Sequence, residues 1–244
     1  MNEFSLTGKT ILVTGASSGI GKVTAVLISK YGAAVYITGR NKENLEETYS
    51  GLQASGHRLF VADLTNEDEM DQMINDLPAL NGIVHCAGIV DPLPVKFIKQ
   101  ADIDKMFGIN FHVPVNLTGK ILRKKKLLDH ASIIFISTIA TRNPYFGGAL
   151  YSSSKAALEA YSKTIALELV SRGIRSNCLM AGLVKTPMIE NPPEKDMERE
   201  AHERYLKRYP LGIGEPEDVA ATILFFLSDA SKWITGTSLI LGGE

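Results

Sequence analysis

The chain has 244 residues, of which 45% are hydrophobic and 22% are charged, as in an ordinary globular protein. Its 26 Lys and Arg residues nearly balance 27 Asp and Glu residues, and a net charge of −1 argues against a nucleic-acid-binding module. The length fits one α/β domain with a large core, and no apolar run approaches the roughly 18 residues of a membrane-spanning helix.

Seven short runs rich in apolar and β-branched residues predict buried strands. In chain order they are Thr10–Thr14, Ala34–Thr38, Leu59–Ala62, Gly82–Ala87, Ser132–Thr138, Arg175–Ala181 and Ser238–Leu241. Several of these runs are continuously apolar rather than alternating, which is typical of parallel strands covered on both faces.

Helical patterns lie between these strands. Ile20, Val23 and Leu27 recur on one helix face, and the longest helical pattern runs from Tyr151 to Arg172. Asn66 precedes three acidic residues and predicts a helix N-cap. Alternating strands and helices with short connections predict an α/β fold: a doubly wound, seven-stranded parallel sheet with helices on both faces.

The segment from Val184 to Gly214 stands outside this alternation. It carries four prolines around a charged run and is too long for a plain connection. We therefore predict a single domain over residues 1–244, in which residues 184–214 form a flap over a substrate site.

The cysteines and histidines give little sign of special chemistry. Cys86 and Cys178 lie far apart in apolar runs and predict two reduced thiols in a cytoplasmic protein, with one disulfide as the alternative. The five histidines lack metal-ligand spacing, so no metal site is predicted, and His85 is interpreted as a buried strand residue. The run Lys124–Lys126 is interpreted as a solvated helix end.

A glycine-rich turn connects the first predicted strand to the first helix. Its sequence is Thr14-Gly15-Ala16-Ser17-Ser18-Gly19-Ile20-Gly21. A diphosphate at such a turn meets bare backbone N–H groups at a helix N-terminus. Gly15 permits the tight turn, Gly19 lets the backbone approach the diphosphate, and Gly21 lets the helix pack close to the sheet. Ser17 and Ser18 add hydroxyl donors, so this turn predicts a Rossmann-type dinucleotide site.

The ends of the second and third strands bear on the choice of dinucleotide. An acidic residue after the second strand would bind a ribose 2′-OH, whereas an arginine would pair with a 2′-phosphate. Arg40 occupies this place, and no acidic residue follows before Glu43. This favours NADP(H), with NAD(H) as the alternative. Asp63 ends the third strand and either touches the adenine or begins the next turn.

Tyr151 and Lys155 open the longest helix at a spacing that puts both side chains on one face. A tyrosine phenol has a pKa of about 10, and a nearby cation lowers it toward the range useful for proton transfer. The strand Ser132–Thr138 ends in two hydroxyls, Ser137 and Thr138, at the edge where such sheets bind ligands.

These features together resemble the short-chain dehydrogenase/reductase family, in the branch of 3-oxoacyl-acyl-carrier-protein reductases and related carbonyl reductases. The resemblance covers essentially the whole chain. Its motifs are Leu6-Thr7-Gly8-Lys9, the glycine-rich turn, Asp63, Ala87-Gly88, Asn110, Tyr151-x-x-x-Lys155, Asn177, Gly182, Thr186 and Thr235-Gly236.

The resemblance implies a catalytic tetrad. Tyr151 would be the general acid and base, Lys155 would bind the nicotinamide ribose and lower the Tyr151 pKa, and Asn110 would support a water and Lys155. The family's serine position falls on Thr138, whose hydroxyl makes the same hydrogen bond although its methyl group restricts the side chain. Ser137 is the alternative.

The resemblance also implies which residues contact the cofactor. They are Gly15, Ser17, Ser18, Gly19, Ile20, Gly21, Arg40, Asp63, Leu64, Ala87, Gly88, Tyr151, Lys155, Gly182, Val184 and Thr186. Three places depart from the family's usual sequence. His85-Cys86-Ala87-Gly88 replaces Asn-Asn-Ala-Gly, Ala181-Gly182 replaces Pro-Gly, and Leu241 stands where an acidic residue is usual.

Three functions follow as hypotheses. The first is an NADP(H)-dependent oxidoreductase that reduces a ketone or 3-oxoacyl carbonyl to a secondary alcohol, with Tyr151 as proton donor. The second is an NAD-linked dehydrogenase of a secondary alcohol, sugar or steroid. The third is a dinucleotide-binding sensor or scaffold without catalysis. The family implies a homotetramer or homodimer, and neither nucleic acid nor membrane is expected as a partner.

Overall fold

The computed structural model of the protein describes residues 3–188 and 210–243. The strands are β1 (Thr10–Thr14), β2 (Ala34–Gly39), β3 (Arg58–Val61), β4 (Leu80–His85), β5 (Leu127–Thr138), β6 (Arg175–Ala181) and β7 (Ser238–Leu241). The helices are α1 (Gly19–Lys30), α2 (Lys42–Ser50), α3 (Glu67–Asp76), α4 (Gln100–Phe107), α5 (Val113–Arg123), α6 (Ala149–Glu168) and α8 (Pro216–Leu227).

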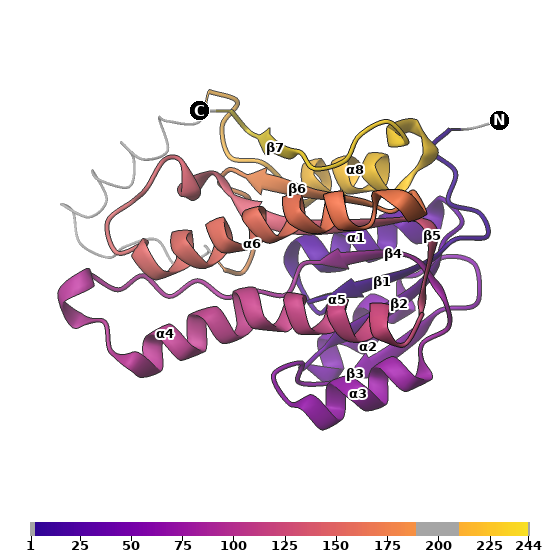
Figure 1. Cartoon of the computed structure of the whole chain (residues 1–244), viewed down its shortest axis with the longest axis horizontal. Helices are drawn as coiled ribbons and strands as arrows, with labels where there is room; N and C mark the ends of the chain where they lie inside the picture. Colours follow the sequence, from indigo (N-terminus) through magenta and orange to yellow (C-terminus); the bar gives the residue numbers. More distant parts are fainter. Residues whose placement is uncertain (1–2, 189–209, 244) are drawn as a thin grey trace.

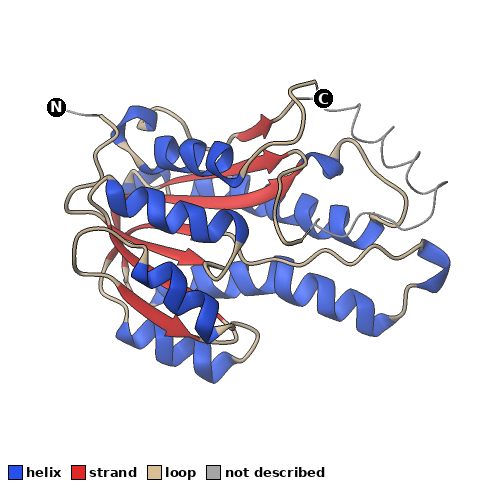
Figure 2. Cartoon of the chain, turned by 180° about the vertical axis from the view of Figure 1, so that it is seen from behind, coloured by secondary structure: helices blue, strands red, loops and turns tan. Residues whose placement is uncertain are grey.

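The strands form one parallel sheet in the order β3-β2-β1-β4-β5-β6-β7. Helices α3, α5 and α6 cover one face of the sheet (Figure 1), and α1, α2 and α8 cover the other (Figure 2). The predicted single α/β domain with a seven-stranded parallel sheet is therefore confirmed. The strand order reverses between β1 and β4, and an open α/β sheet of this kind binds ligands in the crevice at that point.

Alternate residues of the central strands enter opposite cores. Leu12 of β1 packs with Met70 of α3 and Leu117 of α5 on one face, whereas Ile11 packs with Ala25 of α1 and Ile223 of α8 on the other. All these side chains are nearly fully buried. This is why the strand sequences are continuously apolar.

The predicted strand bounds are right within two residues except at one strand. β5 begins at Leu127, five residues before the prediction, and its pairing with β4 is irregular between Leu80 and Gly82. Polar Asp129 and His130 lie in this irregular stretch, and His130 has a φ of +62°. Because a bulge interrupts the apolar pattern, the sequence hides the beginning of the strand.

Local signals placed helix ends well. The Asn66 side chain accepts hydrogen bonds from the backbone N–H groups of Asp68 and Glu69, which confirms the predicted N-cap. The longest helix, α6, starts at Ala149 and ends at Glu168, and a short 3-10 turn (Val170–Arg172) continues it.

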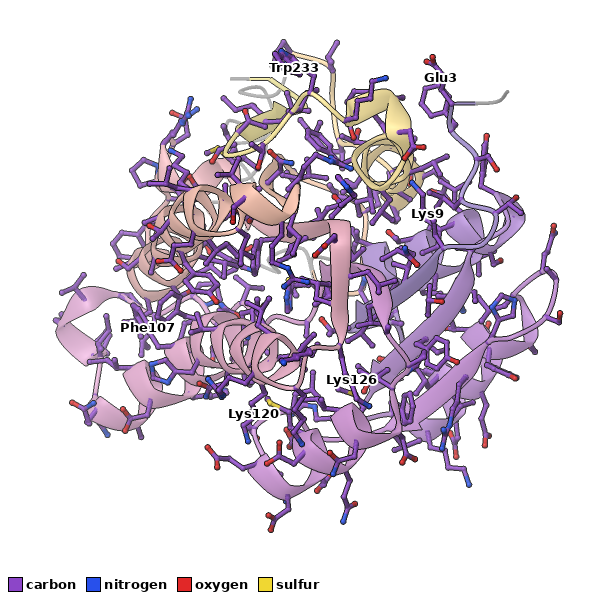
Figure 3. All side chains as sticks on the ribbon, turned by 45° about the vertical axis from the view of Figure 1, so that its right-hand side comes forward. Glu3, Lys9, Phe107, Lys120, Lys126 and Trp233 are labelled. Carbon is purple, nitrogen blue, oxygen red and sulfur yellow. The ribbon has the colours of Figure 1, made fainter. Side chains whose placement is uncertain are left out.

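The lysine run after α5 is bound to α3 in part. Lys124 and Lys125 are exposed, as predicted for a helix end, but Lys124 also donates to the Asn75 side chain of α3 at 2.6 Å. Lys126, however, donates to the backbone carbonyl of Asn75, at 2.6 Å, and Lys120 of α5 donates to Asp71 of α3, at 2.9 Å. Figure 3 labels Lys120 and Lys126 in the lower half of the view.

Most of the predicted flap, residues 189–209, lies outside the described residues. Its two ends lie side by side, because Val184 and Gly214 form a parallel bridge. The backbone N–H of Lys185 donates to the Gly214 carbonyl, and the Gly214 N–H donates to the Leu183 carbonyl, both at 2.9 Å. The chain therefore leaves β6 and returns to α8 at one place.

Within the described residues, no helix combines the length and apolar character needed to cross a membrane. Among the described residues, no group of three or more His, Cys, Asp or Glu side chains could hold a metal ion. Cys86 and Cys178 are both free thiols, as predicted.

Candidate active site

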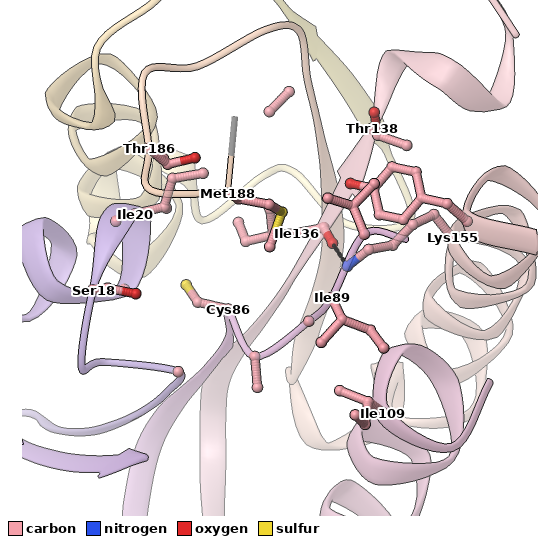
Figure 4. A pocket seen from close by; sticks show the side chains of 18 of the residues that line it. Ser18, Ile20, Cys86, Ile89, Ile109, Ile136, Thr138, Lys155, Thr186 and Met188 are labelled. Atoms are coloured by element: carbon pink, nitrogen blue, oxygen red, sulfur yellow. Dashed lines mark hydrogen bonds between the residues drawn. The ribbon is translucent and has the colours of Figure 1, made fainter. Parts of the chain in front are cut away.

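A cleft of about 1270 Å³ opens at the carboxyl edge of the sheet. Ser18, Ile20 and Thr186 lie on one side of it, Thr138 and Lys155 lie on the other, and the Cys86 sulfur is between them (Figure 4). These residues come from the ends of β1, β4, β5 and β6 and from the starts of α1 and α6. The cleft therefore lies where the strand order reverses.

The glycine-rich turn lines one side of the cleft. Gly15 and Gly19 have left-handed φ angles of +65° and +51°, which glycine adopts without strain. A Cβ on Gly15 would stand 2.7 Å from the Ala87 backbone nitrogen, and one on Gly21 would stand 2.3 Å from the Gly15 carbonyl oxygen. The turn is therefore packed so tightly against the segment after β4 and against itself that both positions need glycine.

The turn presents hydrogen-bond donors to the cleft. Helix α1 begins at Gly19, so the N–H groups of its first turn have no partner within the helix. Ser18 is the N-cap, but its side chain makes no capping hydrogen bond, and it lines the cleft. A Cβ on Gly19 would lie 3.2 Å from the Thr186 methyl group, so Thr186 closes over this turn. The site is thus suited to an anionic group such as a diphosphate.

Arg40 and Asp63 line the far end of the cleft, after β2 and β3. Asp63 does begin a turn, since its Oδ1 accepts from the Thr65 N–H at 2.9 Å and from the Thr65 hydroxyl at 2.7 Å. The Thr65 N–H, the Thr65 hydroxyl and the Arg40 charge hold the pKa of Asp63 below its usual value. Arg40 is exposed, so its guanidinium can meet a ligand at this end.

Lys155 is the buried cation of the site. Its side chain is 5% exposed, and Nζ donates a 2.8 Å hydrogen bond to the Ile136 carbonyl, drawn in Figure 4. Burial in the protein disfavours the charged ammonium and lowers the pKa of Lys155 from 10.5 to about 8.

Asn110 supports the site from behind rather than lining the cleft. It lies in a π-helical turn (Gly108–His112) between α4 and α5 and is fully buried. Its Oδ1 accepts from the Ile89 N–H at 2.8 Å, and its Nδ2 donates to the Ile89 carbonyl and to Ser154 Oγ. A Cβ on Gly88 would stand 3.2 Å from both Asn110 Oδ1 and Lys155 Nζ, so the bare backbone of Gly88 lets the three residues meet.

The two hydroxyls at the end of β5 have different surroundings. The Thr138 side chain lies in the cleft (Figure 4), and its Oγ1 accepts from the Ala140 N–H at 3.2 Å. The Ser137 hydroxyl donates to Glu159 Oε1 of α6 at 2.6 Å. Successive residues of a strand face opposite ways, so the two hydroxyls point in different directions, although Ser137 also lines part of the cleft.

His85 and Cys86, at the end of β4, stand where the family usually has two asparagines. One of them is structural and the other lines the cleft. His85 is 3% exposed, stacks on Phe135 with ring centroids 4.7 Å apart, and hydrogen-bonds Thr118 at 3.0 Å. Burial lowers the pKa of His85 to about 3, so it is neutral and structural, as interpreted from the sequence. Cys86 lines the cleft, and burial raises the pKa of its thiol to about 12.

Comparison with known proteins agrees with this geometry. The family described as "Enoyl-(Acyl carrier protein) reductase" matches residues 15–243. The 3-oxoacyl-acyl-carrier-protein reductase FabG of Rickettsia felis is 36% identical over 240 residues, covering 98% of this chain and 97% of that protein. The chain belongs to the short-chain dehydrogenase/reductase family.

Other members of the family are similar along their whole length. The 3-oxoacyl-acyl-carrier-protein reductase FabG of Thermotoga maritima is 33% identical and covers 98% of both chains. The crystal structure of a dehydrogenase/reductase from Sinorhizobium meliloti has a TM-score of 0.86 at 33% identity and covers 99% of this chain and 96% of that one. The protein is therefore an oxidoreductase that acts on carbonyl and hydroxyl groups with NAD(P).

The structure brings nearly every predicted site residue to this one cleft. All sixteen predicted cofactor residues line it, from Gly15 to Thr186, and so does Thr138. Of the four predicted catalytic residues, only Asn110 does not line the cleft.

The sequence did not single out several cleft residues. They are chiefly apolar: Ile89, Val90, Pro92, Ile109, Pro144, Tyr145, Phe146 and Met188. Tyr145 and Phe146 follow the end of β5, at the edge of the sheet where ligands bind. This position is the one signal by which the sequence could have indicated that they line the cleft.

Proposed function

We propose that the protein reduces a ketone of the 3-oxoacyl type to a secondary alcohol with NADPH. One observation carries the proposal: Tyr151, Lys155 and Thr138 line one side of a cleft whose other side is the glycine-rich turn and whose far end holds Arg40. This arrangement supplies a proton donor and a carbonyl-binding hydroxyl together with a dinucleotide site.

The residues present fit a nicotinamide dinucleotide. The glycine cradle at Gly15–Gly21 and the unpaired N–H groups of α1 would hold the diphosphate, with Ser17 and Ser18 as further donors. Arg40 would pair with a 2′-phosphate through a charge-assisted contact, which favours NADPH over NADH. When bound, the reduced nicotinamide supplies the hydride.

Tyr151 donates the proton in this proposal. Tyr151 and Lys155 are one helical turn apart on α6, so the ammonium lies on the same face as the phenol. A neighbouring positive charge stabilises the phenolate left after proton donation, which makes the phenol a stronger acid. Asn110 holds the loop at Ile89 against α6 and so keeps Lys155 next to the cleft.

Thr138 orients the ketone. Its Oγ1 already accepts from the Ala140 N–H, so its own hydrogen is available to donate to a substrate carbonyl. Ser137 is the weaker candidate because its hydrogen bonds the Glu159 carboxylate at 2.6 Å.

Ketone reduction is favoured over reduction of a carbon–carbon double bond. The matching family carries an enoyl reductase description, but the full-length relatives named above are 3-oxoacyl reductases. Two hydroxyl groups, from Tyr151 and Thr138, line the same cleft, and a polar carbonyl oxygen can accept from both. The thioester carbonyl of an enoyl substrate can accept from them as well, so the preference for a ketone rests on the full-length relatives.

The test is NADPH oxidation with β-ketoacyl thioesters, diketones and ketosugars, each assayed with wild type and Tyr151→Phe. We expect turnover with a β-ketoacyl thioester that falls at least a hundredfold in the variant, while the Kd for NADPH stays within about threefold. Absence of Tyr151-dependent turnover on every substrate would reject the proposal. The expected oligomer and cytoplasmic location stay predictions.

A further inference from the structure

We infer that Glu159 is a positioning residue for Thr138: its carboxylate fixes the end of β5 against α6 and so aims the Thr138 hydroxyl. The inference rests on the proposed function, because it concerns the hydroxyl that would meet the ketone. Glu159 lies on α6 and is half-buried.

The first contact joins Glu159 to the residue before Thr138. Ser137 Oγ donates to Glu159 Oε1 at 2.6 Å, the length of a charge-assisted O–H···O⁻ hydrogen bond. Ser137 Oγ also lies 3.4 Å from the Lys155 carbonyl, a much longer contact. Its single hydrogen therefore serves the carboxylate.

The second contact joins Glu159 to the turn after Thr138. Thr141 Oγ1 lies 3.0 Å from the same Glu159 Oε1 and 3.1 Å from the Thr138 carbonyl. A hydroxyl has one hydrogen to donate, and an ionised carboxylate is a stronger acceptor than a carbonyl. One carboxylate oxygen thus holds residues on both sides of Thr138.

The turn between these contacts sets the direction of the Thr138 hydroxyl. Thr138 is the N-cap of the short 3-10 turn Ile139–Thr141, and its Oγ1 accepts from the Ala140 N–H at 3.2 Å. That hydrogen bond exists only while the turn is closed. When it forms, the hydroxyl hydrogen points away from Ala140 and remains free for a carbonyl in the cleft.

Glu159 also links this turn to the other catalytic candidates. Tyr151, Lys155 and Glu159 follow one another at intervals of four residues along one face of α6. Lys155 holds β5 through the Ile136 carbonyl, and Glu159 holds it through Ser137 and Thr141. The two contacts together set the spacing between the Thr138 hydroxyl and Tyr151.

The test compares Glu159→Ala with Glu159→Gln. The alanine variant loses both hydrogen bonds, whereas the glutamine oxygen still accepts from both hydroxyls. Glu168→Ala, an exposed position on the same helix, is the matched control. Each is made in wild type and in Thr138→Ala, and kinetics are measured with NADPH and the best β-ketoacyl thioester.

We expect Glu159→Ala to lower kcat by roughly tenfold or more, because small misplacements of a catalytic group are costly. The Kd for NADPH should stay within about threefold, and Glu159→Gln and Glu168→Ala should stay within about threefold of wild type in kcat. In Thr138→Ala, adding Glu159→Ala should cost less than about threefold, since both changes remove one interaction. An equal loss in both backgrounds, or no loss in wild type, would overturn the inference.

A second measurement does not depend on activity. Hydrogen exchange at the Ala140 amide reports the bond to Thr138 Oγ1 directly, and Glu159→Ala should speed it at least tenfold while Glu159→Gln should not. Unchanged exchange in Glu159→Ala would overturn the inference even if the enzyme reduces ketones. If Tyr151→Phe leaves turnover intact while exchange responds as expected, the proposed function fails but the role of Glu159 in holding Thr138 stands.

Discussion

Lys155 Nζ donates a 2.8 Å hydrogen bond to the backbone carbonyl of Ile136 and thereby joins α6 to β5 two residues before Thr138. The ammonium is nearly excluded from water at this place. Removing an ion from water raises its free energy, and one carbonyl replaces only part of its hydration. The site therefore holds its cation at a cost to folding stability.

This cost predicts how stability depends on pH. The pKa of Lys155 is 10.5 in the unfolded chain and about 8 in the folded one, so the unfolded state binds the proton more tightly. At about 1.4 kcal/mol per pKa unit, the charge destabilises the fold by roughly 3 kcal/mol below pH 8. The penalty disappears as pH rises from 8 toward 10.5.

Lys155→Met should therefore be more stable than wild type at pH 7 and lose most of that advantage by pH 9.5, in urea denaturation of the protein without cofactor. Lys163→Met, at an exposed position on the same helix, should change little at either pH. An advantage of the same size at both pH values would show that repacking, and not the charge, is its cause.

Gly21→Ala should disrupt the glycine-rich turn. The new Cβ would stand 2.3 Å from the Gly15 carbonyl oxygen, which is backbone and cannot rotate away. We expect a loss of about 2 kcal/mol in unfolding free energy and at least tenfold weaker NADPH binding, measured by denaturation and by calorimetric titration. Gly119→Ala is the control, because its Cβ meets only the end of the Arg123 side chain. It should leave NADPH binding unchanged and stabilise α5 by about 0.5–1 kcal/mol.

Arg40→Leu should discriminate between the two dinucleotides. If Arg40 pairs with a 2′-phosphate, the Kd for NADPH should rise roughly tenfold or more while the Kd for NADH stays within about threefold. Arg58→Leu is the matched control, since its guanidinium pairs with Asp76 at 2.7 Å outside the cleft. Equal changes for NADPH and NADH in Arg40→Leu would count against 2′-phosphate recognition and favour the NAD-linked alternative.

Arg175→Met should destabilise the fold far from the cleft. Arg175 is 9% exposed and donates to the Phe226 carbonyl at 2.8 Å and to Ser231 Oγ at 3.0 Å, where α8 ends. Its loss leaves Ser231 Oγ without this donor and the Phe226 carbonyl with the Ser132 hydroxyl alone, so we expect about 2–4 kcal/mol less stability in urea denaturation. Arg58→Met removes a half-exposed ion pair and should cost less than about 1 kcal/mol. Equal effects would contradict the role of Arg175 in holding the end of α8.

Much of the fold and of the dinucleotide site was predictable from short segments of the sequence. The apolar runs predicted all seven strands because strands buried on both faces must be apolar throughout. The glycine-rich turn and the Tyr151–Lys155 pair were visible because each is local: a strand-to-helix turn and one turn of a helix. Sequence spacing alone determines how such neighbours lie.

Tertiary structure decided what depends on contacts between distant segments. The spacing to Tyr151 favoured Thr138 with Ser137 as the alternative, and only the fold shows that the Glu159 carboxylate of α6 engages Ser137 and Thr141. Cys86 lines the cleft and His85 lies outside it. The reason is that β4 pairs with both β1 and β5, which fixes the direction in which each side chain points. Which side chains meet across a sheet follows from the strand order, and no local pattern in the sequence contains that order.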